Sequence, residues 1–328
     1  MPPWRQDAGI DDFLKPLGRP THLSWEDYLA PEDLKRDLQS IPVRLDPEFR
    51  ERLAQSREKM WNDPSGYAPG IPIVLFHGPP GTGKTFAMKV LAAQAGLQSW
   101  TLDVVGLQER SWAPETLFAD ILQKIEGMEG AIIFMDECES FFSRREVLSQ
   151  FASVYVQGQK KMITHFIKWA EGLETKRGWE ARRVILCLAT NMPNKLDPAI
   201  RDRARVTVQF PLPIASQCSH FWAAHAKHLS HREIANLGSA SEGLSFRSLN
   251  SIAEKLCILD AEKAPPPVHR PGEPSSAAFK AEIQRCKADG KQLWQERIAL
   301  YYQVAKEVLW QLAQGMYLAK NVRYIARL

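Results

Sequence analysis

The sequence predicts an α/β protein built on a parallel β-sheet and followed by a small helical domain. Three apolar runs, at 73–76, 131–135 and 184–188, are each followed by polar residues and are separated by patterns with helical spacing. Strands that alternate with helices along a chain form parallel sheets covered by helices on both faces. Two weaker strand signals, at 99–105 and 206–210, raise the expected number of strands to five.

The same patterns divide the 328 residues into five expected segments. They are a polar leader (1–20), an α/β domain (21–213), a small all-helical domain (214–261), a proline-rich linker (262–279) and a basic amphipathic C-terminal helix (280–328). Ser24, with an acid two residues later, predicts the start of a capped helix with an apolar stripe at Leu34, Leu38 and Ile41. The α/β domain is therefore expected to begin with a helix ahead of its first strand.

Composition and charge exclude several protein classes. The chain is 45% hydrophobic with a formal net charge of +4, as expected for a globular protein. Its apolar runs are far shorter than the roughly 20 residues that cross a bilayer, and its first residues lack the apolar core of a signal peptide. Its five cysteines occur singly, so neither a disulfide framework nor a zinc site is indicated. We expect no membrane insertion and a reducing compartment, either the cytoplasm or an organelle matrix or stroma.

A glycine-rich segment, GPPGTGKT at 78–85, matches the phosphate-binding pattern GxxxxGK[ST], also called Walker A. Glycines allow backbone N–H groups to surround phosphate oxygens, Lys84 can reach the outer phosphates, and the Thr85 hydroxyl can bind Mg²⁺. The residues expected to contact nucleotide are Gly78, Pro79, Pro80, Gly81, Thr82, Gly83, Lys84, Thr85 and Phe86. The alternative is a glycine turn with a chance lysine. The motif by itself does not distinguish an ATPase from a kinase or a GTPase.

Two consecutive carboxylates, Asp136 and Glu137, follow the apolar run AIIFM about fifty residues after this segment. In a hydrolytic ATPase, Asp136 would hold the Mg²⁺ shell and Glu137 would orient and deprotonate the attacking water. Two acids after a strand can also be an ordinary helix cap. The spacing from the glycine-rich segment favours the ATPase interpretation, in which the pair belongs to a Walker B motif.

A third motif follows at 184–213, VILCLATNMPNKLDPAIRDRARVTVQFPLP. The three motifs in this order resemble the AAA family of ATPases, the AAA+ proteins that include katanin, spastin and related remodellers, and the resemblance covers roughly 21–260. It implies a P-loop NTPase parallel sheet, the AAA+ large domain, followed by a helical lid, with ATP and Mg²⁺ as cofactors. It also implies that Asn191 is sensor 1, which helps to position the hydrolytic water, and that Arg203 is an arginine finger for the nucleotide of the neighbouring subunit.

The arginine-finger segment departs from a common family pattern. Many relatives carry two adjacent arginines, whereas Asp202 precedes Arg203 here, which is closer to the single-finger form of the meiotic-checkpoint and mitochondrial members. Arg201 and Arg205 keep two interpretations, surface salt bridges or auxiliary roles. In the lid, Arg247 lies near the position that contacts phosphate in some relatives, and the alternative is a lid-surface residue.

Substrate contact is the second departure. Family members that thread polypeptides carry an aromatic residue, a second residue and a glycine in a central-pore loop. The matching segment is QERSWAPETLF, where Trp112 is the expected pore aromatic and Pro114 stands at the usual glycine. A tryptophan in a polar loop is otherwise most often half-buried packing. A second pore loop could be lined by Arg144, Arg145, Lys160 and Lys161, although a solvated charged face also explains these residues.

The C-terminal helix keeps two interpretations as well. Its stripe at helical spacing consists of Trp294, Ile298, Tyr301, Ala305, Val308, Leu312 and Met316. In the first interpretation the helix is the last element of the lid or packs against another subunit. In the second it is a docking element for a partner, which its excess of basic residues favours.

The motifs and the resemblance together predict an ATPase that converts ATP and water to ADP and phosphate. We expect a homo-oligomeric ring, a hexamer, that remodels or unfolds a protein client. Nucleic acid is not the expected partner, because no recognised nucleic-acid-binding module is present. Two alternatives remain: an AAA+ ATPase that acts on nucleic acid as loaders do, and an ATP-binding assembly subunit with slow or no hydrolysis.

Overall fold

A six-stranded sheet forms the centre of the α/β domain in the computed structural model, which describes residues 9–18, 22–62, 73–110, 114–143, 154–175, 182–263 and 273–291. The strands are β1 (Leu14–Gly18), β2 (Ile73–His77), β3 (Gln98–Leu102), β4 (Ala131–Met135), β5 (Ile185–Thr190) and β6 (Val206–Gln209). Their order across the sheet is β1-β3-β4-β5-β2-β6, and all neighbouring pairs are parallel except β1 and β3. The predicted α/β class with a mainly parallel sheet is confirmed.

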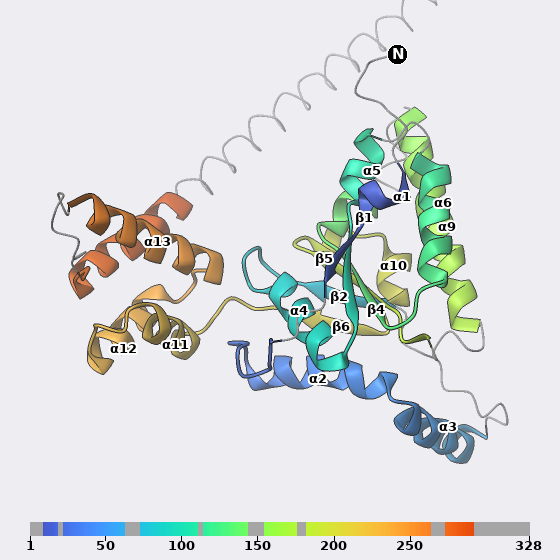
Figure 1. Ribbon diagram of the computed structural model, residues 1–328, viewed down its shortest axis with the longest axis horizontal. Helices are drawn as coiled ribbons and strands as arrows, with labels where there is room; N and C mark the ends of the chain where they lie inside the picture. Colours follow the sequence, from blue (N-terminus) through green and yellow to red (C-terminus); the bar gives the residue numbers. More distant parts are fainter. Residues whose placement is uncertain are drawn as a thin grey trace, which may run out of the picture.

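Helices cover both faces of this sheet (Figure 1). Those of the α/β domain are α1 (Ile10–Phe13), α2 (Glu32–Leu45), α3 (Pro47–Trp61), α4 (Lys84–Ala95), α5 (Val104–Arg110), α6 (Pro114–Glu126), α7 (Cys138–Phe141), α9 (Val154–Thr175) and α10 (Pro198–Arg203), with a short 3₁₀ turn at Pro193–Lys195. The helices α2 and α4 pack on one face, and α6, α7 and α9 pack on the other. The described helices include none that is both long and apolar enough to span a membrane.

Alternation of side chains along the strands divides the core into two layers. On β4, Ile133 points into the layer with α6 and α9, whereas Ile132 and Phe134 point into the layer with α2 and α4. On β5, Leu186 and Cys187 divide in the same way. Because successive residues of a strand face opposite sides, a strand buried on both faces must be apolar throughout, as the predicted runs are.

The sheet has one strand more than the sequence predicts, because part of the expected leader belongs to it. β1 pairs antiparallel with β3, and Phe13 and Leu14 are fully buried in the layer with α6 and α9. The hydroxyl of Ser99 donates a hydrogen bond to the carbonyl of Gly18 at 2.6 Å, which adds a side-chain link between the two strands. The leader pattern hid this strand because Pro16 interrupts its short apolar signal.

The helix that was expected from Ser24 begins later. α2 starts at Glu32, after Pro31, whereas the backbone N–H and the hydroxyl of Ser24 both donate to Asp27 Oδ2, at 2.7 and 2.9 Å. These bonds close a turn ahead of the helix and lower the pKa of Asp27. The predicted apolar stripe, Leu34, Leu38 and Ile41, is buried in the layer where α2 packs against α4 and β6.

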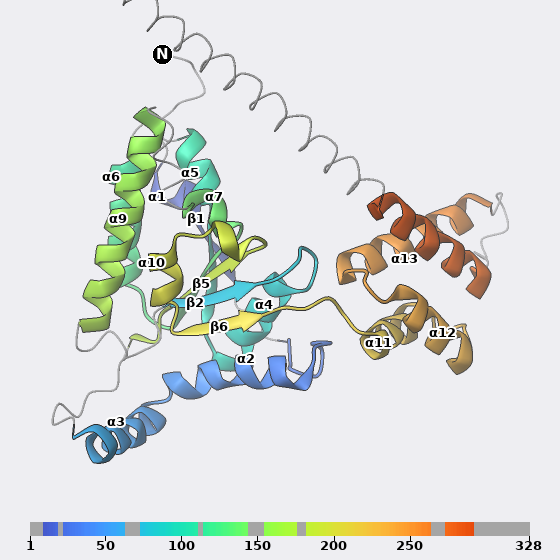
Figure 2. The same ribbon diagram turned by 180° about the vertical axis from the view of Figure 1, so that it is seen from behind.

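A separate helical unit, the lid, follows β6 (Figure 2). It contains α11 (Ala215–His225), α12 (His231–Ser241), α13 (Phe246–Lys263) and a further helix at 276–291. Trp222 is fully buried at its centre, where the indole N–H donates to Ser241 Oγ at 2.8 Å and the ring packs edge-on against Phe279. Phe279 and Ile283 bring the helix at 276–291 into the lid core.

The lid therefore differs from its predicted boundaries. The helix at 276–291 crosses the expected division at 280 between linker and C-terminal helix, and its described part is an element of the lid. Residues 292–328, which hold the predicted aromatic stripe, lie outside the described residues. The partner-docking interpretation of that stripe stays a prediction.

Candidate nucleotide-binding site

Three neighbouring strands bring the three motifs to one edge of the sheet. β5 lies between β4 and β2, and all three are parallel, so their carboxyl ends meet. The glycine-rich loop follows β2, Asp136 and Glu137 follow β4, and Asn191 follows β5. Ligands of open α/β sheets bind at this edge. Parallel order thus places side chains that are more than a hundred residues apart in one cluster.

Backbone geometry explains the glycines of the loop. Gly78 has φ +150°, and a Cβ atom there would lie 2.1 Å from the carbonyl oxygen of Phe210 at the end of β6. Gly81 has φ +75°, and a Cβ atom there would lie 2.7 Å from both Arg247 Cβ and Ser245 Oγ of the lid. Both positions combine a backbone conformation that glycine adopts without strain with a lack of space for any side chain.

The ammonium group of Lys84 lies inside the loop and bonds to acceptors of this chain. Lys84 is 6% exposed, and its Nζ donates to the carbonyl oxygens of Gly78 and Pro79, at 2.8 and 3.0 Å, and to Asn191 Oδ1 at 2.8 Å. These bonds satisfy its three N–H donors. The lysine of the first motif and the asparagine of the third are therefore in direct contact.

Charge and burial act on Lys84 in opposite directions. Burial lowers the pKa of the ammonium, while the nearby carboxylates of Asp136 and Glu139 raise it, and Arg247 lowers it further. Burial penalises the charged form, whereas an opposite charge nearby stabilises it. Lys84 is thus a buried cation whose charge is stabilised by two acids that follow β4. A phosphate group, which carries more negative charge, could replace its present neutral acceptors.

The acidic pair forms a strained turn at the end of β4. Both Asp136 and Glu137 are exposed, and Asp136 Oδ1 accepts the backbone N–H of Glu137 at 2.9 Å. Glu137 has φ +48°, in the left-handed region that residues other than glycine seldom adopt. Strain of this kind is concentrated at functional sites. The turn presents two carboxylates to solvent beside Lys84, as two candidate acids of an ATPase require.

A cavity of about 280 Å³ joins the loop, the acids and the lid. The residues that line it are Pro80, Gly81, Gly83, Lys84, Thr85, Phe86, Asp136, Glu137, Asn191, Phe246 and Arg247. The lid also reaches the loop through its backbone, because the N–H of Arg247 donates to the carbonyl of Gly81 at 3.3 Å. Gly78, Pro79 and Thr82 belong to the loop but do not line the cavity, and Thr82 Oγ1 donates to Pro79 O at 2.8 Å within the loop.

The residues present fit a magnesium nucleotide. The loop leaves no room for side chains at Gly78 and Gly81, and the first turn of α4 offers free N–H groups. The buried ammonium of Lys84 can exchange its neutral acceptors for phosphate oxygens. Thr85 and Asp136 supply the oxygen donors that Mg²⁺ prefers. The site would therefore hold phosphates through the loop and Lys84, and a metal through Thr85 and Asp136.

The candidate arginine finger lies elsewhere. Arg203 does not line this cavity; its Nη1 donates to the carbonyl of Ala199 at 2.9 Å, and its Nη2 forms an ion pair with Glu171 of α9. Its side chain is 19% exposed. The guanidinium thus packs between α10 and α9 in the described residues, and its action on a neighbouring subunit stays a prediction.

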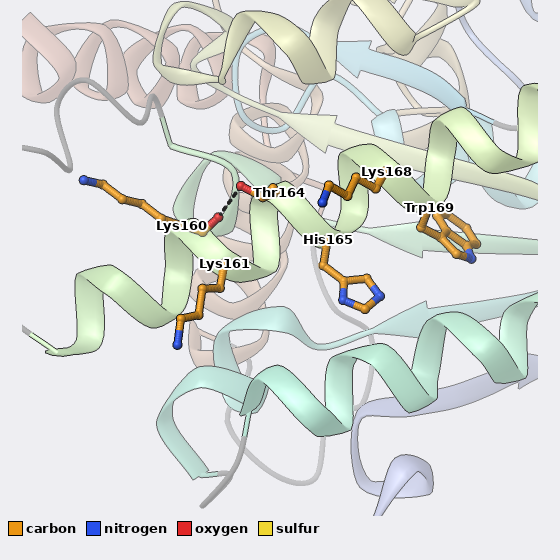
Figure 3. A pocket seen from close by; sticks show the side chains of 6 residues that line it. All are labelled: Lys160, Lys161, Thr164, His165, Lys168 and Trp169. Atoms are coloured by element: carbon orange, nitrogen blue, oxygen red, sulfur yellow. Dashed lines mark hydrogen bonds between the residues drawn. The ribbon is translucent and has the colours of Figure 1, made fainter.

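The expected pore residues are only partly described. Trp112, Arg144 and Arg145 lie outside the described residues. Lys160 and Lys161 belong to the long helix α9 and not to a loop. With Thr164, His165, Lys168 and Trp169 they line a hollow of about 570 Å³ on one side of this helix (Figure 3). Among the described residues that line it are no carboxylates for a metal and no glycine loop, so this basic hollow does not resemble a nucleotide site.

Two residues near the site were not singled out from the sequence. Phe246 lines the cavity next to Arg247. Glu139 lies behind Asn191, where its Oε1 accepts the Asn191 backbone N–H at 3.3 Å. Glu139 is the third acid of the run DECES, but the sequence does not show where its side chain points. That depends on how β4 and β5 place residue 139 beside residue 191.

Comparison with known proteins gives consistent results. Residues 74–212 match the family model described as "ATPase family associated with various cellular activities (AAA)". The mitochondrial sorting homolog of Caenorhabditis elegans is 27% identical over 255 residues, which cover 75% of this chain and 67% of that protein. Spastin of Naegleria gruberi is 26% identical over 258 residues, which cover 76% of this chain and 45% of spastin. The match thus spans less than half of that spastin's length.

A solved structure shares the fold. The crystal structure of the FIGL-1 AAA domain in complex with ADP superimposes with a TM-score of 0.60 at 17% identity, and covers 87% of this chain and 93% of that domain. At this identity the likeness concerns the fold alone. It includes both the α/β domain and the region that follows it, as the coverage requires.

Proposed function

Because this chain carries an AAA-family ATPase domain of the katanin and spastin type, we propose that it hydrolyses ATP in a homo-oligomeric ring, a hexamer, to remodel or unfold a protein client. The observation that carries the proposal is the cluster of Lys84, Asp136, Glu137 and Asn191 around one cavity. The cavity also meets the lid through Arg247, so a bound nucleotide would contact both domains. That contact would couple hydrolysis to movement of the lid.

Each side chain of the cluster has a distinct part in hydrolysis. The loop amides and Lys84 would hold the phosphates, and Thr85 and Asp136 would hold Mg²⁺, which neutralises phosphate charge. Glu137 is exposed next to this position, where it can orient a water molecule and accept its proton. Asn191 can orient the same water through its amide group, once Lys84 turns to phosphate.

An oligomer is part of the proposal because the cavity lacks an arginine finger among its described lining residues. Arg247 comes from the lid, and Arg203 lies between α10 and α9. A finger supplied by a neighbouring subunit contributes about 10³ to 10⁵ in rate in related phosphoryl-transfer enzymes. We propose that Arg203 supplies it in trans, so that an isolated chain hydrolyses ATP slowly.

The client is proposed to be a protein because the chain resembles AAA domains of the katanin and spastin type, which act as remodellers of proteins. The basic hollow on α9, with Lys160, Lys161 and Lys168, is a surface that could contact an acidic segment of such a client. Strong stimulation of hydrolysis by DNA or RNA, and none by protein, would favour the loader-like alternative.

The test is a substrate trap. Glu137→Gln keeps the shape of the site but removes the base, so the variant should bind ATP, form a stable oligomer and retain client proteins from native extract. Client recovery, oligomer mass and bound nucleotide are measured by affinity purification, native mass spectrometry and chromatography. Lys84→Ala, which should bind ATP at least about tenfold more weakly, is the control. The remodelling proposal fails if the trap and the control retain the same proteins.

A further inference from the structure

A third carboxylate stands behind the acidic pair. Glu139 lies in α7, the single helical turn that follows Asp136 and Glu137. Its Oε1 accepts the backbone N–H of Asn191 at 3.3 Å, across 52 residues of sequence. Its other oxygen, Oε2, is screened from solvent and has no hydrogen-bond partner among the described residues. Glu139 thus connects the turn after β4 to the residue after β5.

The single hydrogen bond to Asn191 does not by itself account for this carboxylate. A buried oxygen without a hydrogen bond costs about 1–3 kcal/mol, and more when the group is charged, which offsets the gain from the single bond to Asn191. An apolar side chain at position 139 would avoid that cost. A buried polar atom without a partner calls for a specific explanation, and a functional role is one of them.

The turn that carries Glu139 is held from two other elements. Gln159 of α9 is buried, and its Nε2 donates to the carbonyls of Ser140 and Phe141, both at 2.9 Å. The carbonyl of Phe142 accepts the N–H of Asp197, at the start of α10, at 2.8 Å. α7 is therefore a fixed support, and a hydrogen bond from it can fix the position of another residue.

Asn191 is at the other end of this bond, and the backbone on both sides of it is held by hydrogen bonds. The residue before it is fixed, because the carbonyl of Thr190 accepts the N–H of Gly78 at 3.2 Å. The residue after it, Met192, donates its N–H to Thr190 Oγ1 at 3.0 Å. The backbone N–H of Asn191 donates to Glu139, and the side-chain Oδ1 of Asn191 accepts a hydrogen bond from Lys84 Nζ at 2.8 Å.

We propose that Glu139 is a positioning residue for the hydrolysis proposed above: by binding the Asn191 backbone, it aims the Asn191 side chain at the phosphate end of the cavity. Glu139 does not line that cavity, and its hydrogen bond reaches the cavity through Asn191. The inference rests on the proposed ATPase function. It predicts that removal of Glu139 affects turnover more than nucleotide binding, since Lys84 and the loop keep their other contacts.

The test is a double-mutant cycle in the full chain, with Glu139→Ala, Asn191→Ala and the double variant. For each, kcat and KM for ATP are measured at saturating oligomer concentration, together with the Kd of a fluorescent ATP analogue. We expect Glu139→Ala to lower kcat about tenfold or more, as loss of side-chain alignment does, with a Kd within about threefold of wild type. In the Asn191→Ala background the same change should have no further effect on kcat.

Two further variants separate positioning from a structural role. Glu139→Gln keeps an oxygen acceptor of the same reach and should restore most of the lost kcat. Glu129→Ala removes an exposed carboxylate at the amino end of β4, the opposite edge of the sheet, and should behave as wild type. Hydrogen exchange provides a readout without turnover: the Asn191 amide should exchange faster in Glu139→Ala, because its acceptor is lost.

Several results would overturn the inference. They are kcat losses that multiply in the double variant, a nucleotide affinity and a melting temperature that fall in step with kcat in Glu139→Ala, a Glu139→Gln variant as slow as Glu139→Ala, and unchanged exchange at Asn191. A wild-type chain without ATPase activity at any concentration would instead remove the proposed function itself. The two failures are therefore distinguishable.

Discussion

Lys84 Nζ and Asn191 Oδ1 are 2.8 Å apart, which joins the lysine of the glycine-rich loop to the residue that follows the central strand β5. The contact is possible because β2 and β5 are parallel neighbours in which His77 is opposite Thr190. A phosphate that binds Lys84 competes with this amide oxygen. Release of Asn191 from Lys84 is then a consequence of nucleotide binding.

The first prediction concerns the buried charge. Lys84→Ala should weaken ATP binding at least about tenfold, because the ammonium provides a charge-assisted bond that is worth about 1.5–3 kcal/mol. Lys89→Ala is the matched control, since Lys89 is on the same helix but exposed. Titration with a fluorescent nucleotide measures both. Equal affinities for the two variants would contradict the assigned role of Lys84.

The second prediction concerns the contact between the loop and the lid. Gly81→Ala should weaken nucleotide binding about tenfold or more, because the new Cβ would lie 2.7 Å from Arg247 Cβ and would push the lid away. Gly243 has a similar φ, +87°, but open space around it. Gly243→Ala should therefore lower stability by about 1 kcal/mol without an effect on affinity. If both variants lose affinity equally, backbone strain and not the lid contact is responsible.

The third prediction concerns Arg203. Arg203→Ala and Lys84→Ala should each be inactive alone, but a mixture should recover part of the ATPase activity, because a subunit with an intact Arg203 can serve an intact nucleotide site next to it. Arg232→Ala, which removes an exposed arginine of α12, should be active alone. Steady-state hydrolysis across mixing ratios provides the measurement. A mixture with no more activity than its components would speak against action in trans.

The fourth prediction concerns the thiols. Cys257 is exposed, whereas Cys138, Cys187 and Cys218 are buried. Burial raises the pKa of Cys218 to about 11, and it raises the pKa values of Cys138 and Cys187 as well. Since only the thiolate reacts, the buried thiols gain reactivity only as the pH rises toward these raised values.

At pH 8 a thiol reagent should thus modify Cys257 first, and Cys257→Ser should remove the fast phase of the reaction. Mass spectrometry of partially labelled protein identifies the modified positions. Rapid labelling of Cys138 in the native protein would show that the turn after β4 opens, contrary to the packing of α7 under Gln159.

The sequence predicts the fold class well because each central strand can be recognised from its own residues alone. Each of the three runs at 73–76, 131–135 and 184–188 is apolar throughout, as burial on both faces requires, and each precedes its motif directly. Parallel pairing then brings the motifs together without further information. For this reason the cluster of Lys84, Asp136, Glu137 and Asn191 could be expected before the structure was known.

Other features depend on contacts between distant segments. β1 has only five residues and contains Pro16, so its strand character comes from pairing with β3. The ion pair of Arg203 with Glu171 joins α10 to α9 across 32 residues, and neither residue signals the other in the sequence. The role of Phe279 in the lid was hidden for the same reason, because its partner Trp222 precedes it by more than fifty residues.

The antiparallel strand β1 has a practical consequence for anyone who shortens this protein. Without residues 9–18, β3 would become an edge strand whose backbone groups on one side are unpaired. The apolar layer with α6 and α9 would also lose the cover of Phe13 and Leu14. Exposed margins of this kind recruit strands from other molecules. A fragment that begins at the helix α2 is therefore expected to aggregate during purification, whereas one that begins before Ile10 should stay monodisperse.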